Sequence, residues 1–147
     1  MASYVVTLVD PPTTLALRQQ VLRPHQSVAE MAAETDAPGA LAVAAVRDDL
    51  VLACAMAAPE ALPEQPASPA PWRIRGMATA PEHRRAGLGS QVLERLLDEV
   101  RLRGGRTVWC NARVPARGLY LRAGFAVVGE PWEDPVIGPH LRMWRAI

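Results

Sequence analysis

Apolar residues recur along the chain either as short continuous runs or at helical spacing. Residues 4–10 form an apolar, β-branched run that ends at a pair of prolines, which predicts a strand. Residues 13–23 carry their large apolar side chains at helical spacing up to a proline, which predicts a helix. Ser27 and Glu30 fit a capping box, so we expect a second short helix to begin near Val28.

The segment at residues 40–58 is apolar almost throughout and allows two interpretations. Two strands that turn at Asp48 and Asp49 would form a hairpin, whereas the alternative is one alanine-rich helix. We favour the hairpin because the aspartate pair stands where its turn would be. Residues 59–71 follow with five prolines and little large apolar content, which predicts a surface loop.

Residues 72–79 predict a strand with a local irregularity. Trp72 and Ile74 fall on one side of the alternation, with an arginine after each of them on the other side. After Gly76 the next large apolar residue, Met77, falls on the opposite parity. A glycine combined with a slip in the alternation indicates a β-bulge at Gly76.

The longest helical pattern covers residues 88–100, whose large apolar side chains share one face. Glu99 stands four residues from both Arg95 and Arg103 on the outer side, so we expect ion pairs there, and a glycine pair ends the helix. Later segments predict a strand, a short helix and two further strands, at residues 106–111, 115–123, 125–130 and 140–147.

This order of elements predicts an α/β chain with a mixed sheet of about seven strands and about four helices. The strand–loop–helix crossover lies at residues 72–103. A length of 147 residues fits a single domain over residues 1–147.

Composition narrows the class of protein. Half of the residues are hydrophobic and the formal net charge is +1, which argues against an extended nucleic-acid-binding surface. Cys54 and Cys110 each lie in an apolar stretch and are expected to stay reduced, in a chain without an evident signal peptide. No apolar run approaches the about 18 residues of a membrane span. We expect a cytoplasmic protein with neither nucleic acid nor membrane as partner.

The stretch PEHRRAGLGS at residues 81–90 stands just before the long helix. A helix N-terminus attracts anions, Gly87 and Gly89 would let a phosphate approach the backbone, and Arg84 and Arg85 add positive charge. The stretch lacks the P-loop lysine and the third glycine of a dinucleotide fingerprint, which favours a pyrophosphate bound without magnesium or another metal. The alternative is a helix start that needs glycine only for tight packing.

Two motifs in this chain resemble those of the GNAT N-acetyltransferases. Arg84-x-x-Gly87-x-Gly89 is similar to the family's (Gln/Arg)-x-x-Gly-x-(Gly/Ala) motif, and it is flanked in the same way by a bulged strand and a long helix. ARGLYLRAGF at residues 116–125 looks like the family's Ala-x-x-x-Tyr-x-x-x-Gly-Phe segment, with Tyr120 at its tyrosine. VLRP, WCNAR and IGPHLRM further resemble a small bacterial branch without an assigned substrate.

The resemblance implies a GNAT fold with splayed central strands and acetyl-coenzyme A as the acetyl donor. The family often has an asparagine seven residues before the tyrosine, where this chain has Arg113, and Asn111 lies nine before it. Either Asn111 reaches the cofactor or that contact is absent. The cofactor-binding residues implied are Met77, Ala78, Thr79, Arg84, Arg85, Ala86, Gly87, Leu88, Gly89, Ser90, Asn111 and Tyr120.

The implied chemistry is direct attack of a neutral amine on the thioester, with Tyr120 donating a proton or hydrogen bond to the leaving sulfur. The alternative for Tyr120 is a core tyrosine that packs the short helix. Residues 72–79 contain no carboxylate, so candidates for the base are His140, His25, Glu133 and Asp134, and we favour His140. Cys110 is expected to be a structural thiol and not a nucleophile.

In the family the acceptor pocket lies between the first-helix loop and the last hairpin, here residues 23–26 and 132–140. The resemblance therefore implies Arg23, His25, Trp132 and His140 as acceptor-binding residues, although each histidine by itself also suits a surface loop. We expect transfer of an acetyl group to the primary amine of a small molecule or peptide, by a monomer or a homodimer. The alternatives are a non-catalytic acyl-coenzyme A sensor and a toxin that acetylates charged tRNA.

Overall fold

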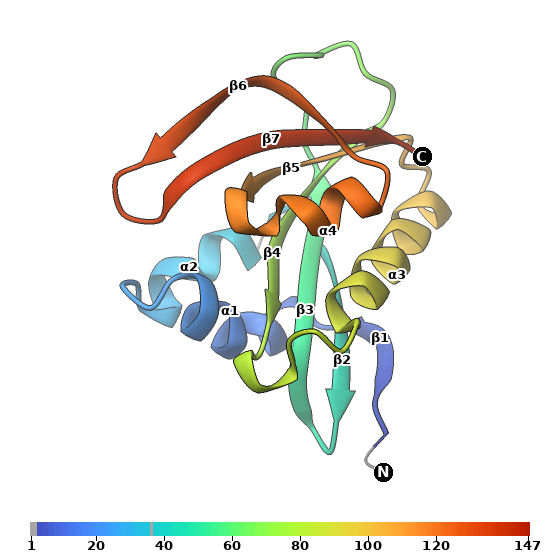
Figure 1. The fold of residues 1–147 in the computed structure, drawn as a ribbon. Helices are drawn as coiled ribbons and strands as arrows, with labels where there is room; N and C mark the ends of the chain where they lie inside the picture. Colours follow the sequence, from blue (N-terminus) through green and yellow to red (C-terminus); the bar gives the residue numbers. More distant parts are fainter. Residues whose placement is uncertain (1–2, 36) are drawn as a thin grey trace.

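The computed structural model describes residues 3–35 and 37–147, which form a seven-stranded mixed sheet with helices packed against it (Figure 1). The strands are β1 (Val5–Val9), β2 (Leu41–Arg47), β3 (Leu50–Pro59), β4 (Pro71–Thr79), β5 (Thr107–Arg113), β6 (Ala126–Asp134) and β7 (Gly138–Ala146). The α-helices are α1 (Leu15–Leu22), α2 (Val28–Thr35), α3 (Leu88–Leu102) and α4 (Arg117–Arg122), with short 3-10 turns at Pro11–Thr14, Pro81–His83 and Val114–Ala116. The predicted α/β class, element order and element numbers are confirmed.

The strand order in the sheet is β1-β2-β3-β4-β5-β7-β6, and only β4 and β5 run parallel. That pair is parallel because α3 returns the chain between them as a crossover. Side chains that alternate along β2 enter separate clusters: Val43 packs in the cluster that contains α3, and Ala44 in the cluster that contains Leu17 of α1. Helices therefore cover both faces of the sheet.

The hairpin prediction for residues 40–58 is confirmed, since β2 and β3 pair in antiparallel fashion. Asp48 and Asp49 both adopt positive φ angles, 50° and 65°, as the tight turn requires. The segment lacks a polar alternation because helices bury both of its faces, and such strands read as continuous apolar runs.

The bulge predicted at Gly76 is confirmed by the pairing of β3 with β4. Cys54 pairs with Ala78 but Met56 pairs with Arg75, so two residues of β4 stand opposite one of β3. Gly76 has a φ of +67°, and a Cβ there would lie 2.6 Å from the Nε of Arg18. The Arg18 side chain of α1 is thus packed directly over the bulge.

The two central strands separate, as expected for splayed strands. Pairing of β4 with β5 runs from Pro71↔Thr107 to Ile74↔Cys110, although β4 continues to Thr79 and β5 to Arg113. Beyond Ile74 the edge of β4 that faces β5 is therefore not paired with it. Two cavities form at this opening.

The last hairpin is longer than the sequence predicts. Strand β6 runs past residue 130 to Asp134, because a register shift between Val128 and Trp132 accommodates both Gly129, with a φ of +73°, and Pro131. Both cysteines are buried free thiols. Within the described residues, none of the helices has the length and apolar character that crossing a membrane requires.

Candidate functional site

Two adjoining cavities open where β4 and β5 separate. The first, which we call the turn groove, has a volume of about 600 Å³ and lies between the end of β4, the turn before α3, and α4. The second, which we call the hairpin cavity, has a volume of about 230 Å³ and lies between α1, the divergent strands and the β6–β7 hairpin. The residues that line both are Leu22, Met77, Arg113 and Ala116, so the two spaces meet at the centre of the opening.

One end of the turn groove is formed by the tight turn that precedes α3. Arg85 and Gly87 have positive φ angles of 66° and 80°, and α3 begins at Leu88 with its N-terminal amides at the groove. Gly87 is needed for this conformation. Position 89 has room for a side chain, since a Cβ there would meet Thr79 Oγ1 at 3.6 Å, which is an ordinary contact. Tight packing therefore does not account for the glycine at position 89.

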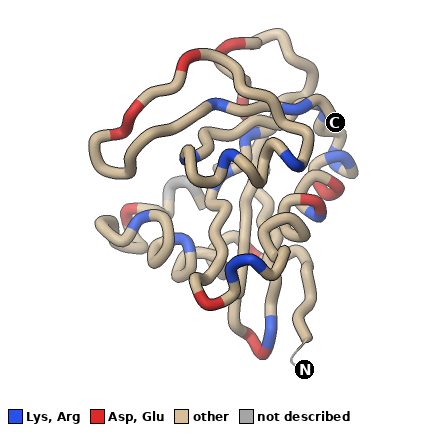
Figure 2. The backbone as a smooth tube through the Cα atoms, in the orientation of Figure 1, with Lys and Arg blue, Asp and Glu red and all other residues tan. Residues whose placement is uncertain are grey.

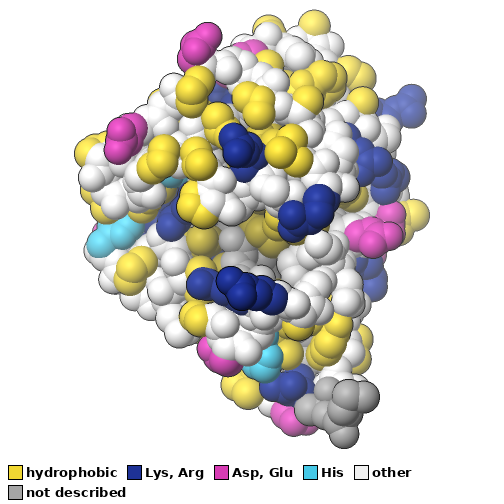
Figure 3. Space-filling view, in the orientation of Figure 1, with side chains coloured by type: hydrophobic (Ala, Val, Ile, Leu, Met, Phe, Trp, Pro, Cys, Tyr) yellow, Lys and Arg dark blue, Asp and Glu magenta, His cyan; other side chains and the backbone are white. Residues whose placement is uncertain are grey.

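The charge of the turn groove is of one sign among the described residues. Its lining contains Arg84, Arg85, Arg113, Arg122 and His83, and no aspartate or glutamate. Figure 2 shows basic positions both at the turn before α3 and on α4, and Figure 3 shows arginine side chains around a hollow on this face. A groove with helix amides, in which every charged side chain is basic, suits a polyphosphate anion.

Most of the residues predicted to bind cofactor line the turn groove: Met77, Ala78, Thr79, Arg84, Arg85, Gly87, Leu88, Gly89 and Ser90. Ala86 does not line either cavity, and Asn111 and Tyr120 line the hairpin cavity instead. Sequence reasoning missed Leu119 and Arg122, which stand three residues apart on one face of α4.

Asn111 and Arg113 have different partners. Asn111 Oδ1 accepts a hydrogen bond of 2.9 Å from Arg142 Nε, on the β7 side of the hairpin cavity. Arg113 donates to the backbone carbonyl of Leu22 at the boundary between the cavities. Of the two, only Arg113 reaches the turn groove.

Tyr120 is a buried residue in the wall of the hairpin cavity. Its side chain is 4% exposed, and its ring packs edge-on against Phe125 at a centroid distance of 5.4 Å. Burial, and then the neighbouring Cys110, raise the pKa of Tyr120 well above 10, so the hydroxyl keeps its proton at neutral pH. Burial likewise raises the pKa of Cys110 to about 12. Cys110 is therefore a neutral thiol, poorly suited to nucleophilic attack.

His140 is 5% exposed and is held from two sides in the hairpin cavity. Its ring stacks on Trp132 with centroids 5.4 Å apart, and its Nδ1 lies 2.8 Å from the carbonyl oxygen of Gly138. A carbonyl oxygen only accepts, so this contact puts the proton of a neutral imidazole on Nδ1 and leaves Nε2 as an acceptor.

Of the other residues predicted to bind or activate the acceptor, some line the hairpin cavity and others are exposed. Trp132 and Asp134 line the hairpin cavity, whereas Glu133 between them is exposed. Backbone amides of Ile137 and Val136 hold the pKa of Asp134 below its usual value. Arg23 lines the cavity, but His25 is exposed on the turn after α1 and does not line it.

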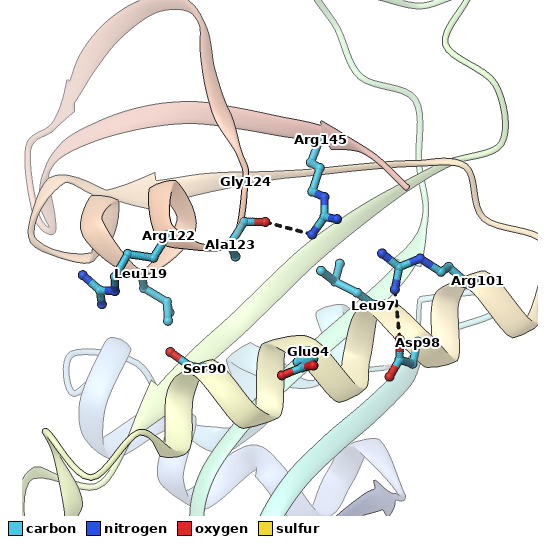
Figure 4. Close-up of a pocket in the computed structure, with 10 residues that line it drawn as sticks. All are labelled: Ser90, Glu94, Leu97, Asp98, Arg101, Leu119, Arg122, Ala123, Gly124 and Arg145. Atoms are coloured by element: carbon cyan, nitrogen blue, oxygen red, sulfur yellow. Dashed lines mark hydrogen bonds and ion pairs between the residues drawn. The ribbon is translucent and has the colours of Figure 1, made fainter.

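A third cavity, of about 570 Å³, lies between α3 and α4 (Figure 4). It shares Ser90, Leu119 and Arg122 with the turn groove and continues it toward Arg145, which donates to the Ala123 carbonyl at 2.8 Å. No group of three or more His, Cys, Asp or Glu side chains in the described part of the chain is arranged to hold a metal ion.

Comparison with known proteins places the chain in a family. The profile of the Acetyltransferase (GNAT) family matches residues 9–125. The chain is 31% identical over 143 residues to the uncharacterized N-acetyltransferase YitI of Bacillus subtilis (strain 168), which covers 97% of this chain and 95% of that protein.

Solved structures share the fold. An aminoglycoside 6′-N-acetyltransferase complexed with coenzyme A matches with a TM-score of 0.76 and 17% identity, over 97% of this chain and 96% of that one. An acyl-CoA N-acyltransferase from Pseudomonas aeruginosa matches with a TM-score of 0.77 and 24% identity, over 98% and 100%. With the family profile and the YitI alignment each spanning most of the sequence, the chain belongs to the GNAT family of acetyltransferases.

Proposed function

We propose that this protein transfers an acetyl group from acetyl-coenzyme A to the primary amine of a small molecule or peptide. The observation that carries the proposal is the junction of the two cavities at Leu22, Met77, Arg113 and Ala116. One cavity is basic and ends at helix amides, and the other contains a buried hydroxyl and an imidazole. A donor and an acceptor bound in the two spaces would meet at the junction.

The lining of the turn groove supports coenzyme A as the carrier of the acetyl group. The pyrophosphate would bind to the amides of residues 84–90, where Gly87 and Gly89 carry no side chain and the charged side chains are basic. The pantetheine arm would lie along residues 77–79 of β4, whose edge is not paired with β5. A backbone N–H near Met77 or Ala78 would donate to the acetyl carbonyl oxygen as charge develops there.

The hairpin cavity supplies the two proton-transfer groups. The amine would lose a proton to Nε2 of His140, directly or through one water, as its nitrogen bonds to the acetyl carbon. The carbon–sulfur bond breaks, and Tyr120 would donate its proton to the departing sulfur. Both assignments rest on the lining of the cavity, on the contact of His140 Nδ1 with Gly138, and on the raised pKa of Tyr120.

A substitution at Gly89 tests the cofactor assignment. Acetyl-coenzyme A should raise the melting temperature of the wild-type protein, since a ligand that binds only the native state stabilises it. Gly89→Glu puts bulk and negative charge in the groove and should abolish this shift. The unliganded variant should remain folded, because an acidic residue suits the first turn of a helix. Gly89→Ala is the matched control for the loss of glycine, and an undiminished shift in Gly89→Glu would contradict the assignment.

Replacement of Tyr120 by phenylalanine tests the chemistry. The variant keeps the ring that packs against Phe125 and removes only the hydroxyl. Turnover, measured as thiol release from acetyl-coenzyme A in the presence of an amine, should fall by a factor on the order of 10². The thermal shift with acetyl-coenzyme A should remain. Turnover within a factor of two of wild type would mean that Tyr120 serves only in packing, and no thiol release with any amine would favour a sensor.

A further inference from the structure

We propose that the acceptor amine also carries an oxyanion, and that Arg23 and Arg113 bind this group in the hairpin cavity. The inference rests on the proposed function and adds the chemical class of its substrate. The acceptor is a small amino acid-like zwitterion, with a carboxylate or a similar oxyanion on the same molecule as the amine.

The first observation is the charge of the cavity. Its lining includes five arginines, Arg18, Arg23, Arg73, Arg75 and Arg113, and among the described residues the only carboxylate that lines it is Asp134. A site for a purely cationic amine would be expected to contain the opposite excess. Positive charge around a bound ammonium group lowers its pKa and favours the neutral, nucleophilic amine.

The second observation is how these arginines are engaged. Glu60 bridges Arg73 and Arg75, with N–O distances of 3.1 and 3.2 Å. Arg18 is 1% exposed and donates to Thr14 and Thr35 at 3.4 and 3.1 Å. These three guanidinium groups are held in place by groups of the protein itself.

Arg23 and Arg113 differ from the other three. No carboxylate of the described residues lies within ion-pair distance of either guanidinium group, and Arg113 donates only to the Leu22 carbonyl. Burial, and then the positive charge of Arg23, lower the pKa of Arg113, while the carboxylate of Asp134 acts in the opposite direction, so one negative charge faces two positive ones. An oxyanion between them would relieve this repulsion, and the planar fork of a guanidinium group matches a carboxylate.

The third observation is the position of the pair relative to the proposed base. Arg113 lies directly opposite His140 in the pairing of β5 with β7, and Trp132 lies opposite His140 on the other side. The carbon skeleton of the acceptor would therefore be short, since its oxyanion and its amine bind to neighbouring groups. A volume of about 230 Å³ is below the about 300 Å³ at which drug-sized pockets begin.

The experiment compares matched amines by thiol release from acetyl-coenzyme A. Each of several amino acids is tested beside its carboxamide and beside the amine that lacks the carboxyl group, with aminoalkylphosphonates as a second source of oxyanion. Polyamines and aminoglycosides represent polycations. The kcat/KM of the carboxylated member should exceed that of its neutral analogues by about 10- to 100-fold, as charge-assisted hydrogen bonds allow. A preference for the phosphonate would identify a phosphate-like group as the oxyanion.

Variants then assign the contact. Arg23→Gln should raise the KM for the oxyanion-bearing acceptor by about 10- to 100-fold. The KM for the carboxamide should not change, because the carboxamide carries no oxyanion. The KM for acetyl-coenzyme A should not change either, because Arg23 does not line the turn groove. Arg23→Lys keeps the charge but not the fork and should recover part of the loss. Arg106→Gln is the matched control, since Arg106 is exposed and lines none of the three cavities.

The outcomes separate the two proposals. If neutral or polycationic amines are acetylated as well as, or better than, the carboxylated and phosphonate amines, the inference is overturned while the proposed function stands. If acetyl-coenzyme A binds but no amine is acetylated, the proposed function is overturned and the inference with it. Should Arg23→Gln fail to fold, the substrate comparison on the wild-type protein still decides, because it needs no variant.

Discussion

Substitution of Gly76 by alanine tests the packing of α1 on the central bulge. The φ of +67° costs a residue with a Cβ about 1–2 kcal/mol in left-handed conformation. The new Cβ would also lie 2.6 Å from Nε and 2.9 Å from Cδ of Arg18, both closer than a Cβ normally approaches another atom. Arg18 is buried and is hydrogen-bonded to Thr14 and Thr35, so its displacement adds about 1–3 kcal/mol of overpacking.

The variant Gly104→Ala separates these two contributions. Gly104 also has a positive φ, of +86°, but a Cβ there would meet nothing within 4 Å, so only the backbone contribution applies. Denaturant unfolding should therefore show Gly76→Ala to be about 1–3 kcal/mol less stable than Gly104→Ala. In an Arg18→Ala background the extra cost should disappear, because the crowding atoms are gone. Equal costs for the two glycine variants, or additivity with Arg18→Ala, would refute the contact.

Three further predictions concern charged and titratable side chains. Hydrogen bonds from Arg103 and then Arg95 hold the pKa of Glu99 below its ordinary 4.5, so its contribution to stability is present above that pH and is lost as the pH falls. Glu99→Gln should therefore lower the melting temperature at pH 7, and its difference from wild type should shrink as the pH falls below 4.5; a difference that does not change with pH would contradict this. Cys54 and Cys110 each have a pKa of about 12 in the native protein, so about 10⁻⁴ of each buried thiol is ionised at pH 8. Iodoacetamide at pH 8 should therefore label them only after unfolding, and rapid labelling of the native protein would contradict their burial. His140→Gln should reduce turnover most for amines of high pKa and least for α-amines, whereas a uniform loss would mean that His140 only positions the acceptor.

Much of the fold is predictable because its signals are local. The parity slip at Gly76 and the aspartate pair of the β2–β3 turn each depend on a few adjacent residues, and both predictions are confirmed. The extent of β6 is not predictable in this way. Gly129 and Pro131 resemble a strand end, and the strand reaches Asp134 because it pairs with β7 across the register shift.

The same difference between local and long-range signals applies to the candidate site. The residues of the glycine turn are contiguous, so one motif finds most of the turn groove, while Arg122 comes from a separate helix. Arg18, Arg73 and Arg75 were not predicted for the hairpin cavity, although the last two share a strand face. A loop residue such as His25 has no periodicity to indicate its direction, and it points to solvent. His140 is buried by Trp132, a contact that depends on strand register.

Mass spectrometry of a complete reaction mixture tests the central claim most directly. The chain contains no lysine, so the protein offers few sites for adventitious acetylation, and intact mass reports clearly on an acyl-enzyme. With acetyl-coenzyme A and a carboxylated amine, free coenzyme A and acetylated amine should appear in equal amounts. With acetyl-coenzyme A alone, the mass of the protein should not change. An acetyl group on Cys110 that forms and is then passed to the amine, or bound acetyl-coenzyme A that acetylates no amine, would contradict direct transfer between the two cavities.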